Sequence, residues 1–137
     1  MIEDEQGLTM ILSIFIIVTL LSLVYAFNIM IQTDNDNLIF STQTSKAFWG
    51  AEAGVETALV YLNKVSPNLN KENSIQGQIG DANYNVTITK DHIFKYEVKS
   101  QGQYQGVTKT IVATLESIDN NGDGQAEGLV IATWREY

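Results

Sequence analysis

The residues best suited to chemistry lie near the C-terminus, in the stretch DNNGDGQAEGLVI. Side chains that carry oxygen alternate along this stretch, and a glycine at position 124 permits a sharp turn between them. Several hard oxygen ligands around one point suit Ca²⁺, with an affinity on the order of 0.1–1 mM in extracellular modules. The sequence therefore predicts a Ca²⁺ site that would hold the last strand to its sheet, with ligands from Asp119, Asn121, Asp123, Gln125 and Glu127.

This loop is not an EF-hand, because the twelfth position of an EF-hand loop is a glutamate and here it is Val130. It is similar to the calcium loops of integrin-type propeller repeats, which close with an acid at the ninth position and then enter a strand. Only the loop is similar, since one such loop does not make a propeller. The alternative is an Asx/Gly turn without metal.

The rest of the chain offers little for catalysis. The only histidine is His92, there is no cysteine, and no nucleophile, base and orienting group can be assembled. We therefore expect a protein that is not an enzyme. The net charge is −8, from 16 acidic and 8 basic residues, and remains −5 without Glu3, Asp4 and Glu5. A nucleic-acid binder needs a basic surface, so no nucleic-acid partner is expected.

A long apolar segment follows an acidic N-terminal peptide that ends at Gly7. No charged residue occurs between Leu8 and Gln32, and the 24 residues LTMILSIFIIVTLLSLVYAFNIMI would span roughly 36 Å as a helix. That length suffices to cross a membrane, and it exceeds the apolar region of a typical secretory signal. A signal cleaved after Ala26 remains the alternative. We assign residues 8–33 to a transmembrane helix.

An amphipathic continuation of this helix is expected over residues 34–66, with its clearest pattern between Ser45 and Asn63. Larger apolar residues, Val55, Leu59 and Leu62, form one edge of its apolar face. Beside them runs a stripe of small residues that permits close approach of another backbone. The stripe packs either against the chain's own sheet or, in addition, against neighbouring copies, and it consists of Ala47, Ala51, Gly54 and Ala58.

The C-terminal part, residues 67–137, has the alternating pattern of β-strands. The stretch SPNLNKENSIQGQIGD is interpreted as a polar connection. Alternation then follows in NYNVTITK, IFKYEVKS and GVTKTIVATLES, with GLVIATW as a fourth strand. Short turns between the strands indicate an antiparallel meander with one face covered by the helix. The predicted fold class is α+β, a long N-terminal helix packed on a small antiparallel β-meander.

In this combination the chain resembles type IV pilin-like proteins, and most closely the PilX-type minor pilins. The stretches that carry the resemblance are QGLTMILSIFIIVTLLSL, KAFWGAEAGVETAL and, more loosely, the hairpin YEVKSQGQYQG. The resemblance implies that residues 1–7 are a prepilin leader, that a prepilin peptidase cuts after Gly7, and that Leu8 becomes the methylated N-terminus. It also implies a single-pass protein of the cytoplasmic membrane with its head outside, which later enters an extracellular filament.

Two positions depart from the usual family pattern. The leader is acidic rather than basic, and Leu12 stands at the fifth mature position, where most major pilins carry glutamate. We therefore expect a minor subunit that supports assembly, priming or adhesion and contacts other pilin subunits through its N-terminal helix. The alternatives are a pseudopilin of a type II secretion system and a signal-anchored single-pass protein whose sheet binds a partner.

Overall fold

The computed structural model describes residues 2–65, 72–92, 95–118 and 128–137. One helix, α1, runs from Ile2 to Val65 without interruption. The chain divides into two compact units, Met1–Phe40 and Ser41–Tyr137, and α1 contributes to both. The first unit holds the apolar segment, and the second holds the end of α1 together with all the described strands. The helix begins before Leu8, so the predicted leader is helical from Ile2 onward.

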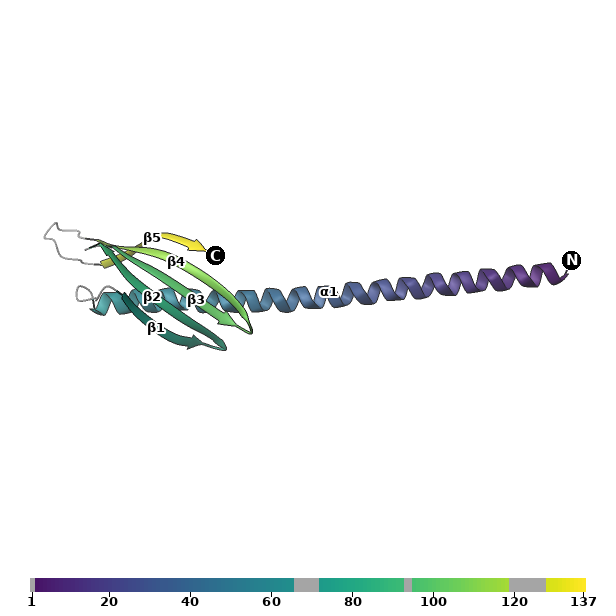
Figure 1. Cartoon of the computed structure of the whole chain (residues 1–137), viewed down its shortest axis with the longest axis horizontal. Coiled ribbons are helices and arrows are strands. Elements are labelled where there is room, and N and C mark those ends of the chain that lie inside the picture. Colours follow the sequence, from purple (N-terminus) through teal and green to yellow (C-terminus); the bar gives the residue numbers. More distant parts are fainter. Residues whose placement is uncertain (1, 66–71, 93–94, 119–127) are drawn as a thin grey trace. The chain divides into compact units, whose positions relative to one another are not determined.

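Five strands form one antiparallel sheet in which sequence neighbours are also spatial neighbours, in the order β1-β2-β3-β4-β5. The sheet lies against the last part of α1, with its strands running obliquely to the helix (Figure 1). The predicted α+β class, a long helix packed on an antiparallel meander, is therefore confirmed. The strands are β1 (Glu72–Ile79), β2 (Ala82–His92), β3 (Lys95–Tyr104), β4 (Val107–Ile118) and β5 (Gly128–Glu136).

The strand β1 corrects the interpretation of SPNLNKENSIQGQIGD as a polar connection, because Glu72–Ile79 pairs with β2 along its whole length. Its polar residues fit an edge strand that is only half covered, in which Asn73, Ile75 and Gly77 turn inward. The turn to β2 consists of Gly80 and Asp81, between the paired residues Ile79 and Ala82. Gly80 has a positive φ of 55°, the conformation that two-residue hairpin turns require.

The hairpin between β3 and β4 uses the same device. Gln105 and Gly106 connect the paired residues Tyr104 and Val107, with φ values of 44° and 83°. Two positive φ values match the right-handed twist of the flanking strands. The hairpin YEVKSQGQYQG of the sequence analysis thus turns at Gln105 and Gly106, and its residues up to Tyr104 belong to β3.

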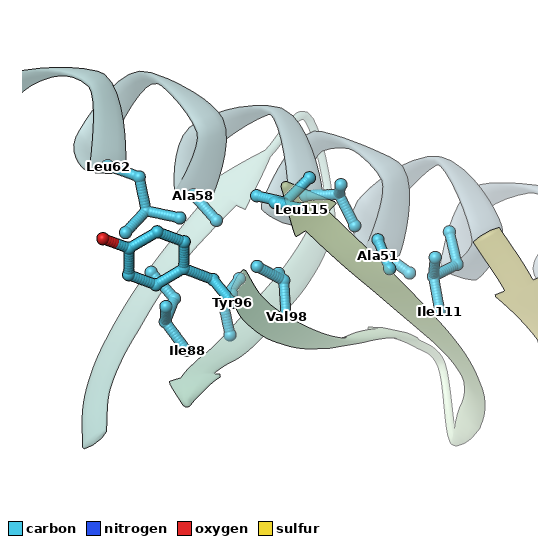
Figure 2. Close-up of a cluster of buried hydrophobic side chains, with 11 residues drawn as sticks. Ala51, Ala58, Leu62, Ile88, Tyr96, Val98, Ile111 and Leu115 are labelled. Atoms are coloured by element: carbon cyan, nitrogen blue, oxygen red, sulfur yellow. The ribbon is translucent and has the colours of Figure 1, made fainter. Parts of the chain in front are cut away.

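The hydrophobic core lies between α1 and one face of the sheet, and its pattern follows the alternation predicted from the sequence. In the middle of β2, β3 and β4 every second side chain is buried, whereas the intervening residues are half-buried or exposed. Figure 2 shows Tyr96 beside Leu62 and Ile88, with Ala51 close to Ile111. The cluster is Ala51, Val55, Ala58, Leu62, Val86, Ile88, Tyr96, Val98, Ile111, Ala113 and Leu115.

A bulge in β5 changes which of its side chains face the helix. Thr133 pairs with Thr114 and Ile131 pairs with Leu115, so Ala132 is an extra residue in the ladder. Beyond the bulge Trp134 lies opposite the buried Ala113 and meets the ring of Phe48 edge-on, with 6.0 Å between the ring centroids. Without the extra residue, strict alternation from Leu129 would place Trp134 on the outer face.

Candidate functional site

The apolar segment of α1 is entirely exposed. Every described side chain from Gly7 to Phe40 is accessible, including Leu8 at 70%. Hydrophobic side chains gain free energy when they leave water, roughly 25 cal/mol per Å², so such a surface calls for lipid or protein around it. In the described part of the chain α1 is the one helix that is long and apolar enough to cross a membrane.

Several polar side chains in this segment bond to the helix itself. In each of them the hydroxyl or amide donates to the carbonyl oxygen four residues earlier, at 2.8–3.0 Å. In a bilayer there is no water to serve as a partner, so polar groups must be satisfied internally. These bonds therefore make the segment compatible with lipid, and they link Ser13 to Thr9, Thr19 to Phe15, Ser22 to Val18 and Asn28 to Val24.

The predicted cleavage residues, Gly7 and Leu8, lie within the helix. A Cβ atom placed on Gly7 would meet nothing within 4 Å, so packing in this fold does not require a glycine there. A glycine inside a helix costs roughly 1 kcal/mol relative to alanine because it loses more backbone entropy. The residue thus weakens the helix at the point where a peptidase would need extended backbone. Leu12, at the predicted fifth mature position, is also exposed.

The predicted small-residue stripe lies at the junction of α1 with the sheet. Ala47, Ala51 and Ala58 are fully buried, and Gly54 is buried as well. Gly50, which the sequence analysis did not select, belongs to the same face: a Cβ there would lie 3.2 Å from the Cβ of Ala82. The stripe is therefore used by the chain's own sheet, which leaves it no exposed surface for a neighbouring copy.

Strand β3 explains why this stripe must be small. Its inward residues decrease in size along the strand, from Tyr96 through Val98 and Ser100 to Gly102. At Gly102 the helix backbone is so close that a Cβ atom would overlap backbone atoms of Ala47 and Ala51. The spacing Tyr-x-x-x-Ser-x-Gly in β3 thus reflects the decreasing space between the strand and α1. Gly102 was quoted within that pattern, but the sequence did not reveal its contact.

Gly54 makes the second close approach. A Cβ on this residue would overlap the hydroxyl of Ser100 and lie 2.7 Å from a methyl group of Val86. Ser100 is fully buried. The neighbour of Gly54 is therefore a short side chain, which can shift, whereas the neighbour of Gly102 is helix backbone, which cannot shift alone.

Lys46 attaches the helix to the turn-bearing end of the sheet. Its Nζ donates to the Tyr104 hydroxyl at 3.1 Å and lies 4.5 Å from the centre of the Tyr104 ring. The Asp81 carboxylate is 3.6 Å away. The hydrogen bond to Tyr104 is the main cause that raises the pKa of Lys46 above its usual value, and partial burial opposes this rise.

This raised pKa predicts a pH dependence. A lysine whose pKa is higher in the folded state stabilises that state below the unfolded pKa of about 10.4, and the stabilisation is lost as pH rises through the folded value. We expect Lys46→Met to lower the melting temperature at pH 8 and to have a smaller effect near pH 11. Lys64→Met, in the last turn of α1, is the control. A difference between wild type and Lys46→Met that stays constant across this range would contradict the account.

The outer face of the sheet carries two adjoining hollows. The larger, of about 630 Å³, lies over β3, β4 and β5, and the smaller, of about 360 Å³, lies over β1, β2, β3 and the start of β4. Gln101 of the smaller hollow is the cross-strand partner of Thr110 in the larger one. The larger hollow is lined by Glu97, Lys99, Thr110, Val112, Thr114, Thr133, Arg135 and Tyr137. The smaller is lined chiefly by the amides Gln76, Asn83, Asn85, Gln101 and Gln103.

The predicted Ca²⁺ ligands, Asp119 to Glu127, lie outside the described residues. They connect the end of β4 at Ile118 to the start of β5 at Gly128. Among the residues that the structure does describe, no group of three or more acidic or histidine side chains could hold a metal ion. This search did not include the residues from Asp119 to Glu127.

Comparisons with protein families, curated proteins and solved structures find no match to this chain.

Proposed function

We propose that this chain is a minor subunit of a type IV pilus or related filament, anchored in the cytoplasmic membrane before assembly. The observation that carries the proposal is the contrast between the two halves of α1. From Gly7 to Phe40 the helix is exposed and largely apolar, while from Ala47 to Leu62 it buries one face against the sheet. An exposed apolar helix suits lipid first and a bundle of similar helices later.

The glycine at position 7 supports the same proposal. No neighbour in the fold explains it, whereas a peptidase that cuts after it would benefit from a residue without a side chain. Leu8 would then become the N-terminus of the mature chain. The partners of this role are the prepilin peptidase and other pilin subunits, and the head would serve priming or adhesion.

The proposal can be tested by fractionation of cells that carry a pilus assembly system. We expect the chain in filaments sheared from the surface, at lower abundance than the major subunit. Gly7→Glu should stay in the membrane fraction, because the added side chain obstructs cleavage. Gln6→Glu adds the same charge one position earlier and should enter filaments. A chain that is abundant in membranes but absent from sheared filaments would refute the proposal.

We also propose that the loop from Asp119 to Glu127 binds Ca²⁺ and so fixes β5 to β4. With an affinity of about 1 mM, 10 mM Ca²⁺ would stabilise the fold by about 1.4 kcal/mol. For a unit of this size we expect a rise of several degrees in melting temperature. The measurement compares full-length chain in detergent with Ca²⁺ and with chelator.

Two variants sharpen this test. Asp123→Asn should remove the response to Ca²⁺, whereas Asp36→Asn, in the first unit, should retain it. Equal melting temperatures with Ca²⁺ and with chelator in the wild-type chain would eliminate the site.

A further inference from the structure

The larger hollow on the outer sheet face, over β3, β4 and β5, contains two cations that have no partner among the described residues. Lys99 and Arg135 lie on either side of Val112 in one cross-strand row, about 10 Å apart along the sheet. Within the described part of the chain neither forms an ion pair or a hydrogen bond. By contrast, the cations Lys46, Lys95 and Lys109 each pair with a carboxylate.

The other groups around these cations are suited to sugars. Hydroxyls of Thr110, Thr114 and Thr133 share the hollow, and Tyr137 provides an aromatic ring at its edge that is 66% exposed. Hydroxyl groups bond to sugar hydroxyls, and an aromatic ring offers an apolar face with a polar tip. The adjoining amide-lined hollow extends the polar surface across the sheet.

We propose that this outer face binds an acidic polysaccharide, with the carboxylate of a uronic acid unit held between Lys99 and Arg135. Arg135 can take the carboxylate in a bidentate pair, and Lys99 supplies a second charge-assisted bond. Neighbouring sugar units would lie against Tyr137 and along the amides toward Gln101. An acidic polysaccharide would then be the target of the proposed adhesive role. This inference rests on the proposed function.

The charges favour a sparsely charged polymer over a sulfated one. Glu97 also lines the hollow, so the side chains around it carry a surplus of one positive charge. The whole chain carries a net charge of −8, which repels a dense polyanion. A polymer with one carboxylate per repeating unit suits both the small positive surplus of the hollow and the negative charge of the whole chain.

The test measures binding of full-length, unprocessed chain to immobilised hyaluronan, in a detergent without a sugar headgroup and with Ca²⁺ present. Chondroitin sulfate serves as the sulfated comparison and dextran as the neutral one. We expect binding to hyaluronan that weakens with salt, and weaker binding to the other two polymers.

The variant Lys99→Gln/Arg135→Gln should reduce hyaluronan binding at least about tenfold, because two charge-assisted bonds are lost. Lys64→Gln/Lys90→Gln makes the same change in net charge elsewhere and should bind like wild type. Tyr137→Ala should reduce binding more modestly. All three variants should melt like wild type, since these side chains lie outside the core.

Four results would overturn the inference: no binding to hyaluronan, equal binding to dextran, tighter binding to chondroitin sulfate, or equal losses in the two double variants. Because the chain is unprocessed in this experiment, its outcome does not depend on leader cleavage. If the chain is cleaved and enters filaments but does not bind hyaluronan, the proposed function stands and the polysaccharide inference is refuted.

Discussion

Replacing Gly102 with alanine is expected to destabilise the unit Ser41–Tyr137 by about 3 kcal/mol, at the upper end of the usual cost of overpacking. The added methyl group would overlap backbone atoms of Ala47 and Ala51 in α1. Backbone within a helix cannot move locally, so the helix and β3 would have to separate. Separation would loosen the whole core, because the small-residue stripe and the sheet share this junction.

Denaturant unfolding of the full-length chain in detergent measures this effect, with Trp134 as a fluorescent reporter that contacts Phe48. Gly128→Ala is the matched control, since it makes the same substitution at the start of β5, where a Cβ meets nothing within 4 Å. An unfolding midpoint for Gly102→Ala that equals that of Gly128→Ala would show that the helix does not approach β3 as described.

Tyr96→Ala is the second substitution with a large expected effect, a loss of about 3–5 kcal/mol. Tyr96 is 1% exposed and is the largest fully buried side chain among the described residues. It fills space between α1 and the sheet, beside Leu62 and Ile88 (Figure 2). Truncation leaves a cavity that the helix cannot close, because Gly102 already brings the two layers into contact at the other end.

The same unfolding measurement distinguishes this core effect from a general effect of losing tyrosine. Tyr25→Ala removes an exposed tyrosine of the first unit, 69% accessible, and should leave the unfolding of the second unit unchanged. A loss below about 1 kcal/mol for Tyr96→Ala would mean that the core relaxes around the vacancy, contrary to the rigid junction inferred here.

The helix and the central strands were predictable because their periodicities are strong. Val86, Ile88 and Val98 alternate with polar residues, and the structure buries all three. Lys109 departs from this pattern, because it occupies an inward position of β4 and is charged. Its Nζ lies 3.0 Å from the Glu136 carboxylate of the neighbouring strand β5, which supplies a partner for the charge.

Strand β1 was missed because an edge strand buries little and so needs few apolar residues. Its sequence, ENSIQGQI, resembles a loop by composition. The Gly80-Asp81 turn that pairs it with β2 became evident only from the structure. The bulge at Ala132 was not predictable either, since it depends on the cross-strand contact that brings Trp134 to Phe48.

The candidate sites show the same division between local and long-range information. The sequence selected the stripe from Ala47 to Ala58 by spacing, but its partners Ser100 and Gly102 became evident only from the paired strands. The cations Lys99 and Arg135 are 36 positions apart in the chain and meet only through the order of β3, β4 and β5. No sequence pattern within one strand could bring them together.

The measurement that most directly tests the central proposal is the intact mass of the full-length chain after expression with and without a prepilin peptidase. The account predicts that the enzyme removes residues 1–7 and adds one methyl group at Leu8, and that the chain keeps its full N-terminus without the enzyme. A chain that stays uncut in the presence of an active peptidase, or one cut after Ala26, would contradict it.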